Sequence, residues 1–385
     1  MFWANLNFVQ RVPGGADFTI LWKGARNFMM QGVTPYGTLT TLNIQNLVYG
    51  RAARPDQNPL RVGAPFYIVL LFMPFGAIAD LAIARALWMM ALEAALVGLV
   101  FLSLHLSRWK SGPLYLILLM FFGVFWAPAG WALFSGSTIV FQTLMLLGAF
   151  RAIEFNSDEL AGMLMFLAAV NIEATGPVIL LALFWAVSVG RWRIWGGFWM
   201  AAFLLFGLAM LFMPSWPLEF LRAVLATWRS QPLPGGFSLL ETWFPGVGTR
   251  LAQGTAITAA VILAFEWRGV FGRDIRWLFW TASLTAAMTP LLGLPFSFAW
   301  LTFSFPAFVL ILSVMELRWG ILGRIGAIAL LLSAFAALWA VVNANLSAGW
   351  YVFGAPVVLV IFLYWVRWWA IRPPRLWADS VIGRD

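Results

Sequence analysis

Long apolar runs, separated by short polar joints, dominate the chain from residue 86 onward. A run of about 15–22 apolar residues is long enough for a helix that crosses a bilayer. Such runs predict spans near 86–105, 113–128, 136–151, 158–172, 174–190, 195–213, 251–267, 277–293, 297–315, 322–343 and 350–369. The pattern therefore predicts an all-α, polytopic integral membrane helix bundle with about 10–12 transmembrane helices.

The joints between these runs alternate in charge. One set carries the basic residues Arg108, Lys110, Arg151, Arg191, Arg193, Arg268, Arg273, Arg276, Arg318, Arg367, Arg372 and Arg375. The opposite joints, near 129–135, 173, 294–296 and 344–349, carry no Lys or Arg. Because basic joints stay in the cytoplasm, we expect a multi-pass protein of the cytoplasmic (plasma) membrane. Residues 1–85 then form an extracytoplasmic first loop, and 86–385 form the bundle with a second outer loop at 214–250.

Two segments of the first loop need separate treatment. The run 64–79 is short and holds Pro65 and Pro74; counted as a span it would invert every later joint, so we expect an interfacial or re-entrant segment. Residues 1–15 contain no span, although the loop that they open must be translocated. Either the N-terminus crosses unaided, or an upstream in-frame stretch encodes a further apolar helix of roughly 20 residues. A stop codon directly before Met1 would exclude the second explanation.

Composition supports the membrane assignment and removes several kinds of chemistry. The chain is 62% hydrophobic and 10% charged, with a mean hydropathy of +0.87. It has no cysteine and one histidine, His105, which excludes thiolate or histidine metal clusters and a Ser-His-Asp triad. The net charge of +9 comes mostly from helix ends, so we expect no nucleic-acid partner. We identify no metal site and no cofactor, although a divalent cation stays possible.

The stretch 16–37 contains a predicted amphipathic helix in the first loop. Asp17 can cap its first turn, and Gly32 ends it. One face would be apolar, with Phe18, Leu21, Trp22, Ala25, Phe28 and Met29, while Lys23, Arg26 and Asn27 lie away from it. Such a helix would lie flat on the outer membrane surface.

The first loop also carries an ordered set of residues that resembles a known family. The set is Asp17, Phe18, Trp22, Ala25, Arg26, Gly32, Pro35, Tyr36, Gly50, Arg51 and Pro65. It is similar to the first loop of GT-C glycosyltransferases, in particular the family-87 (DUF2029-like) polyprenyl-phosphate-dependent mannosyltransferases. The resemblance covers about a quarter of the chain. It implies a GT-C-like bundle with a catalytic Asp at the start of the first outer loop.

The chemistry of such a transfer indicates roles for particular residues. A sugar on polyprenyl phosphate needs a carboxylate to take the acceptor's proton and cations on the leaving phosphate. Asp17 is the candidate base; the alternative is a helix cap worth about 0.5–2 kcal/mol. Candidates for the donor phosphate are Arg85 and Arg250 first, then Arg26, Arg51 and Arg61, with interfacial anchoring as the alternative. Trp22, Tyr36, Glu219 and Glu241 are candidates for acceptor binding.

Three functions fit these observations. The first is an outward-facing glycosyltransferase that moves a mannose-like hexose from a polyprenyl-phosphate donor to a glycolipid or glycan acceptor with inversion. The second is a transporter or flippase for a lipid-linked saccharide, which should show two matching halves; no such repeat is visible. The third is a non-catalytic membrane scaffold derived from a GT-C enzyme. Replacement of Asp17 by Asn should abolish transfer but leave a transporter largely unaffected.

Overall fold

The computed structural model describes residues 1–54, 57–110, 112–230, 234–343 and 348–371, which are helical and contain no strand. Asp56, Arg372 and Arg375 lie outside these ranges. The bundle consists of α6 (Leu81–Leu106), α7 (Pro113–Phe125), α8 (Ala127–Ser135), α9 (Ile139–Glu154), α10 (Asp158–Ala168), α11 (Ile172–Ser188), α12 (Arg193–Phe212), α15 (Gly248–Val270), α16 (Ile275–Met288), α17 (Phe305–Asn343) and α18 (Ala355–Ile371). Short 3-10 or π turns add η1 (Thr289–Leu292), η2 (Phe298–Ser304) and η3 (Trp350–Gly354).

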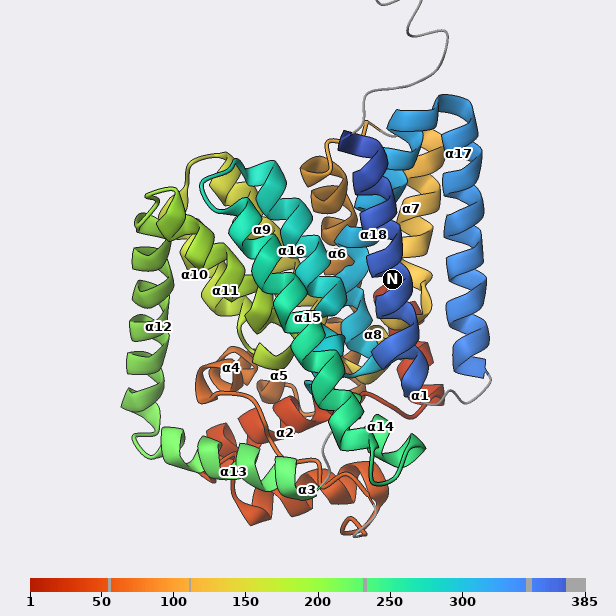
Figure 1. Ribbon diagram of the computed structural model, residues 1–385. Helices are drawn as coiled ribbons and strands as arrows, with labels where there is room; N and C mark the ends of the chain where they lie inside the picture. The colour runs from red at the N-terminus through yellow and green to blue at the C-terminus, as the bar shows by residue number, and fades with distance from the viewer. Residues whose placement is uncertain (55–56, 111, 231–233, 344–347, 372–385) are drawn as a thin grey trace, which may run out of the picture.

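Seven further helices complete the described part of the chain. They are α1 (Phe2–Arg11), α2 (Ala16–Gln31), α3 (Thr38–Tyr49), α4 (Phe66–Leu71), α5 (Met73–Ala77), α13 (Trp216–Ser230) and α14 (Gly236–Trp243). Helices α2, α3, α4, α5, α13 and α14 gather at one end of the bundle, below the long helices in Figure 1. We call this the Asp17 end. The opposite end holds the joints 107–110, 155–157, 189–192 and 271–274, and we call it the joint end.

Length and hydropathy identify the helices that are able to cross a membrane. Among the described residues five stretches qualify: Leu81–Leu106, Arg193–Phe212, Gly248–Val270, Phe298–Asn343 and Trp350–Trp369. A sixth results if α7 and α8, bent by 46°, count as one span. The stretch through α17 is interrupted at Gly320, whose backbone (φ 52°, ψ −121°) is not helical, so α17 is two helices joined there. This all-α architecture is consistent with a polytopic membrane helix bundle.

Helix α2 ends before Gly32, as the sequence predicts, but its start and its surroundings differ from the prediction. Gly15 and Gly32 flank it in the left-handed conformation (φ 77° and 63°), which costs glycine little. Asp17 lies within the first turn, so the expectation that it caps the helix is wrong. Phe18, Leu21, Trp22 and Ala25 are buried as expected, but they pack on α4, α5, α6 and α8. Protein therefore covers the face that we expected to lie on lipid.

One polar residue of α2 is buried although it lies off the predicted apolar face. Asn27 is buried, and its amide donates to the Thr40 hydroxyl of α3 at 3.3 Å. The expectation that Asn27 faces away from the core is thus wrong, because α3 packs over that side of α2. A buried amide is stable there since Thr40 satisfies it.

The proline-containing segment 64–79 forms two short helices, α4 and α5, in place of one spanning helix. Pro74 lies at the start of α5, where its missing N–H costs no helical hydrogen bond. The carbonyl of Gly76 accepts a hydrogen bond from Arg26 Nη1 at 2.9 Å, and that of Ile78 accepts one from Trp22 Nε1 at 3.3 Å. These bonds attach α5 to α2 without a crossing of the bundle.

Candidate functional site

The start of α2 is fixed against the end of α8. The Gly15 N–H donates to the carbonyl of Phe134 at 2.9 Å. Three residues after Gly15, Phe18 packs closely on Gly136. A Cβ added to Gly136 would lie 2.5 Å from the Phe18 Cβ. Because the contact involves two glycines and two backbones, it leaves little freedom for Asp17, which lies between Gly15 and Phe18.

The Asp17 carboxyl is accessible to solvent but surrounded by protein. Its side chain counts as exposed, yet the protein atoms packed around it desolvate the charge and raise the pKa of the Asp17 carboxyl. The Ser135 hydroxyl opposes this rise in pKa. That hydroxyl is buried and forms no hydrogen bond of ordinary geometry with any described residue, so its contact with Asp17 is loose. Accessibility together with a raised pKa suits a carboxylate that takes up a proton.

Arg85, a first-choice candidate for the donor phosphate, is buried beside Gly15 at the start of α2. Its Nη1 donates to the carbonyl of Val12 and its Nη2 to that of Phe134, both at 3.1 Å. A Cβ on Gly15 would lie 2.5 Å from Arg85 Nε, which itself has no partner among the described residues. The guanidinium therefore joins the segment before α2 to the end of α8, and its phosphate role stays a prediction.

The other predicted phosphate ligands are scattered. Arg26 donates to Gly76, as described above, and lies 5.8 Å from the ring centre of Trp22. Arg51 donates to the carbonyl of Ala52 at 2.9 Å. Arg250 is exposed near the start of α15 and bonds to no described residue. Of the three, only Arg250 is free to meet a ligand without losing a protein contact.

The acceptor candidates fall into three places. Trp22 is buried against Ile78. Tyr36 donates to the carbonyl of Ala64 at 2.9 Å and packs on Phe220 of α13; burial raises the pKa of its hydroxyl, with the charge of Glu219 as a smaller cause. Glu219 accepts hydrogen bonds from Thr34 and Ser215. Tyr36 and Glu219 thus share one junction between α13 and the loop after α2.

Glu241, the remaining acceptor candidate, lies between α14 and α15. Its carboxylate accepts hydrogen bonds from the Thr249 hydroxyl at 2.7 Å, the Gly246 N–H at 3.1 Å and the Thr249 N–H at 2.8 Å. The Thr249 hydroxyl is the main reason that the pKa of Glu241 is lowered. Glu241 therefore secures the beginning of α15. Among the described residues, no contact joins Glu241 to Asp17.

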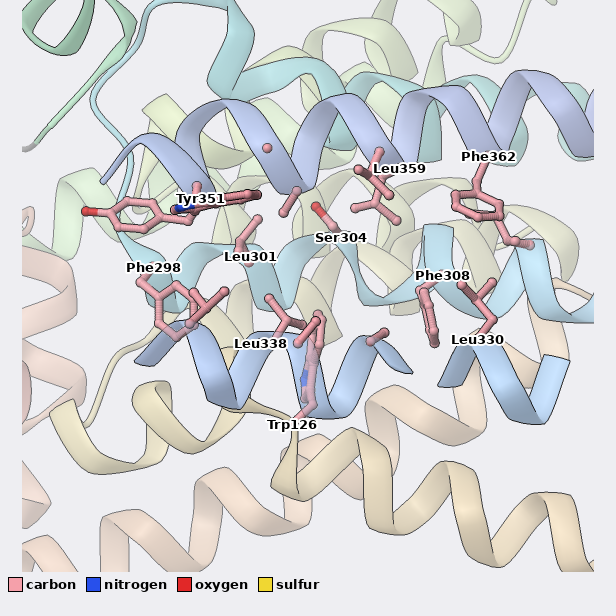
Figure 2. Close-up of a pocket in the computed structure, with 18 of the residues that line it drawn as sticks. Trp126, Phe298, Leu301, Ser304, Phe308, Leu330, Leu338, Tyr351, Leu359 and Phe362 are labelled. Atoms are coloured by element: carbon pink, nitrogen blue, oxygen red, sulfur yellow. The ribbon is translucent and has the colours of Figure 1, made fainter. Parts of the chain in front are cut away.

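A long apolar cavity of about 230 Å³ lies between η2, the two stretches of α17, η3 and α18. In Figure 2, Phe298 and Tyr351 lie at one end of it and Phe308, Leu330 and Phe362 at the other. Its other labelled residues are Trp126, Leu301, Ser304, Leu338 and Leu359. The lining is almost entirely hydrocarbon and aromatic, which suits an alkyl or prenyl chain.

Helix α8 separates this cavity from Asp17. Trp126 at one end of α8 lines the cavity, and Ser135 at the other end contacts Asp17. Between them Trp131 meets Phe298 edge to face at 6.3 Å, and Phe298 meets Tyr351 at 5.7 Å. The end of the cavity at Phe298 and Tyr351 is therefore the end nearer to Asp17.

A second apolar cavity, of about 210 Å³, lies between α4, α6, α9 and α10. Its lining includes Phe72, Trp88 and Phe141. Phe18, the residue after Asp17, contacts Phe72 at 6.1 Å and Trp88 at 6.0 Å between ring centres. The residue next to Asp17 thus packs on the wall of this second cavity, although Asp17 itself lines neither cavity.

Sequence reasoning missed the partners that define this site. Ser135 and Phe134 belong to an apolar run with no motif, and only the fold brings them to Asp17. It also missed Arg222 and Arg229, which lie seven residues apart on an amphipathic helix and share a cavity with Arg61. Within the described ranges no group of three or more His, Cys, Asp or Glu residues could hold a metal ion. Comparison with protein-family models, curated proteins and solved structures found no match.

Proposed function

We propose that this protein is an integral membrane glycosyltransferase with a GT-C-like bundle of about 10–12 spans. It moves a mannose-like hexose from a polyprenyl-phosphate donor to a glycolipid or glycan acceptor. In this proposal the Asp17 end faces the extracytoplasmic side of the cytoplasmic membrane, where a flipped lipid-linked sugar is available and nucleotide sugars are not. The helices of that end, α2, α3, α4, α5, α13 and α14, cover the reacting groups.

The observation that supports the proposal best is the setting of Asp17. A carboxylate with a raised pKa is a stronger base than an ordinary aspartate, and this one is accessible. One apolar cavity lies across α8 from it, and the neighbouring Phe18 packs on two residues that line another. A lipid-linked sugar needs this combination, because its tail requires hydrocarbon surroundings while its head group reacts in a polar place.

The reaction requires one proton transfer and one exchange of bonds at the anomeric carbon. Asp17 takes the proton from the acceptor hydroxyl as the oxygen of that hydroxyl bonds to the anomeric carbon. The bond between that carbon and the phosphate oxygen breaks, and the polyprenyl phosphate leaves with the electron pair. Attack opposite the leaving group inverts the anomeric centre. Arg250, exposed and unpaired among the described residues, is the predicted cation best able to meet the departing phosphate.

The cavity in Figure 2 provides a place for the donor's tail. The nearer end of the cavity, at Phe298 and Tyr351, connects to Asp17 through Trp131 and the rest of α8. A prenyl chain that entered there would run along α18 toward Phe362, with its phosphate left on the side of Asp17. Burial of the chain contributes roughly 25 cal/mol per Å² of apolar surface removed from water.

Replacement of Asp17 by Asn tests the proposal, with Asp80→Asn as the matched control. The assay measures hexose transfer by purified, reconstituted protein from a panel of polyprenyl-phosphate sugars to glycolipid acceptors. Loss of the base should reduce the transfer rate by about a hundredfold to ten-thousandfold. Asp80 caps α6 by accepting from the Ala82 N–H at 2.7 Å. Asn caps as well as Asp, so Asp80→Asn should transfer at the parent rate.

Stability separates loss of chemistry from loss of fold. Because the folded-state pKa of Asp17 is raised, its ionised form at neutral pH opposes folding. The neutral Asn should therefore melt at the parent temperature or above it. A parent that transfers, together with Asp17→Asn protein that transfers equally well, would exclude Asp17 as the base. A transporter or scaffold would instead show no transfer with any donor.

A further inference from the structure

Three arginines at the Asp17 end line one cavity. Arg61 precedes α4, while Arg222 and Arg229 belong to α13. With Leu225 and Ala226 they surround an open recess of about 380 Å³, within the range of about 300–1,000 Å³ found for small-molecule sites. Arg222 and Arg229 are seven residues apart, so two helical turns bring them to the same face of α13.

Within the described ranges none of these three charges is balanced by an acid. No ion pair involves them, and the recess has no carboxylate in its lining. The nearest acid on α13, Glu219, is already engaged by Thr34 and Ser215. Arg61 Nη1 is buried without a hydrogen-bond partner. A buried charged donor without a partner is costly, so this guanidinium suits a site that an anion completes.

We propose that Arg61, Arg222 and Arg229 form a binding site for a phosphate-bearing anion, either a pyrophosphate or the phosphate of an anionic lipid. The planar guanidinium binds phosphate oxygens in pairs and keeps its charge. Three of them around one recess suit a phosphate group, either the multiply charged pyrophosphate or the singly charged phosphodiester of a lipid. Leu225 lines the same recess and is exposed, which provides an apolar surface beside the charged group.

This site is distinct from the surroundings of Asp17. Val62, next to Arg61, packs against Gly24 in the middle of α2. Gly24 lies seven residues beyond Asp17, about 10 Å along the helix axis. The phosphate site therefore does not depend on the proposed transfer reaction, and its occupancy is measured without any sugar donor.

Binding of two probes to purified protein tests the site. Pyrophosphate is titrated into protein in neutral detergent by calorimetry, and retention of added phosphatidylglycerol is measured by native mass spectrometry. The double variant R222Q/R229Q is compared with R268Q/R276Q, which removes two exposed arginines near the joint end. Each guanidinium lost from the site should weaken binding roughly tenfold, whereas the control pair should bind as the parent does.

The outcomes distinguish the two sources of phosphate. If R222Q/R229Q loses pyrophosphate binding but still retains phosphatidylglycerol, the site takes a water-borne or exposed pyrophosphate. If R222Q/R229Q loses phosphatidylglycerol but still binds pyrophosphate, the site takes a lipid head group. The single variants R222Q and R229Q replace the double variant if it does not purify. The site is excluded if the parent binds neither probe, if the arginine variants bind as the parent does, or if the control pair loses binding equally.

Discussion

The charged residues at the two ends of the bundle have different kinds of partner. All five ion pairs among the described residues lie toward the joint end: Arg151–Glu154, Arg191–Asp158, Arg193–Glu159, Arg324–Glu316 and Arg367–Glu266. Arg367 also stacks on Trp280 at 4.3 Å. These five arginines are neutralised within the chain. The other basic residues of this end form no ion pair with a described residue: Arg108, Lys110, Arg268, Arg273, Arg276 and Arg318.

At the Asp17 end the charged residues have other partners. Arg26 and Arg85 donate to backbone carbonyls, and Asp80, Glu219 and Glu241 accept from hydroxyl or backbone groups. Arg222, Arg229 and Arg250 form no ion pair with a described residue. Among the described residues, no charge of this end is therefore neutralised by an ion pair.

The difference separates charges that hold the fold from charges that are open to a ligand. A buried charge without an opposite partner lowers stability unless something outside the chain completes it. Arg61 Nη1 is such a buried group, whereas the exposed Arg222, Arg229 and Arg250 are solvated by water. Perturbed and unpaired ionisable groups gather at functional sites for this reason, although structural networks also produce them. The Asp17 end has both kinds of feature, a carboxyl with a raised pKa and unbalanced guanidinium groups.

The strongest way to disturb the Asp17 end is to add one methyl group at Gly15. Gly15→Ala would force an alanine into the left-handed conformation and place its Cβ against Arg85. We expect the free energy of unfolding to fall by about 3 kcal/mol, and transfer to fall with it because Asp17 moves. Denaturant unfolding in detergent measures the first effect.

Gly32→Ala is the matched control at the other end of α2. Gly32 is also left-handed, but nothing lies within 4 Å of the added methyl group. Its cost should be about 1 kcal/mol, from backbone strain alone. Equal losses for the two variants would show that the contact with Arg85 does not hold the start of α2.

A smaller effect is expected when a charge is removed at the joint end. Arg191 donates to Asp158 at 3.2 Å and to the carbonyl of Ile153 at 3.0 Å. The Asp158 side chain is 13% exposed, so Asp158→Asn should lower the free energy of unfolding by about 2 kcal/mol. Transfer measured at low temperature should stay at the parent rate, since this end holds the fold only.

Glu159→Gln provides the control for that change. Glu159 faces Arg193 at 3.7 Å, and both side chains are mostly exposed, at 51% and 79%. An exposed pair of this kind contributes about 0.5 kcal/mol or less. If Asp158→Asn impairs transfer while the protein stays folded, the division of roles between the two ends is incorrect.

The sequence predicted the end of α2 correctly and its partners poorly. The end of α2 follows from Gly32, because glycine ends helices by a local conformational preference. The burial of Asn27 could not be predicted, since it depends on Thr40 arriving from α3. The membrane character followed from hydropathy alone, because lipid selects long apolar helices whatever their order in space.

The candidate site shows the same division. Asp17 and Arg85 were identified as single residues at the edges of apolar runs, and the fold brings both to the end of α8. The contacts with Ser135 and Phe134 join segments far apart in sequence, and no spacing rule indicates them. The pair Arg222 and Arg229 was detectable in principle, because a heptad spacing of arginines on an amphipathic helix places both on one face.

The central claim is that the Asp17 end lies outside the cell, and labelling of single cysteines tests it most directly. The chain has no cysteine, so Asn46→Cys at the Asp17 end and Lys110→Cys at the joint end each introduce one exposed thiol. A membrane-impermeant maleimide applied to intact cells should label Asn46→Cys at once and Lys110→Cys only after permeabilisation. Labelling in the reverse order would place Asp17 in the cytoplasm and contradict the proposed extracytoplasmic transfer.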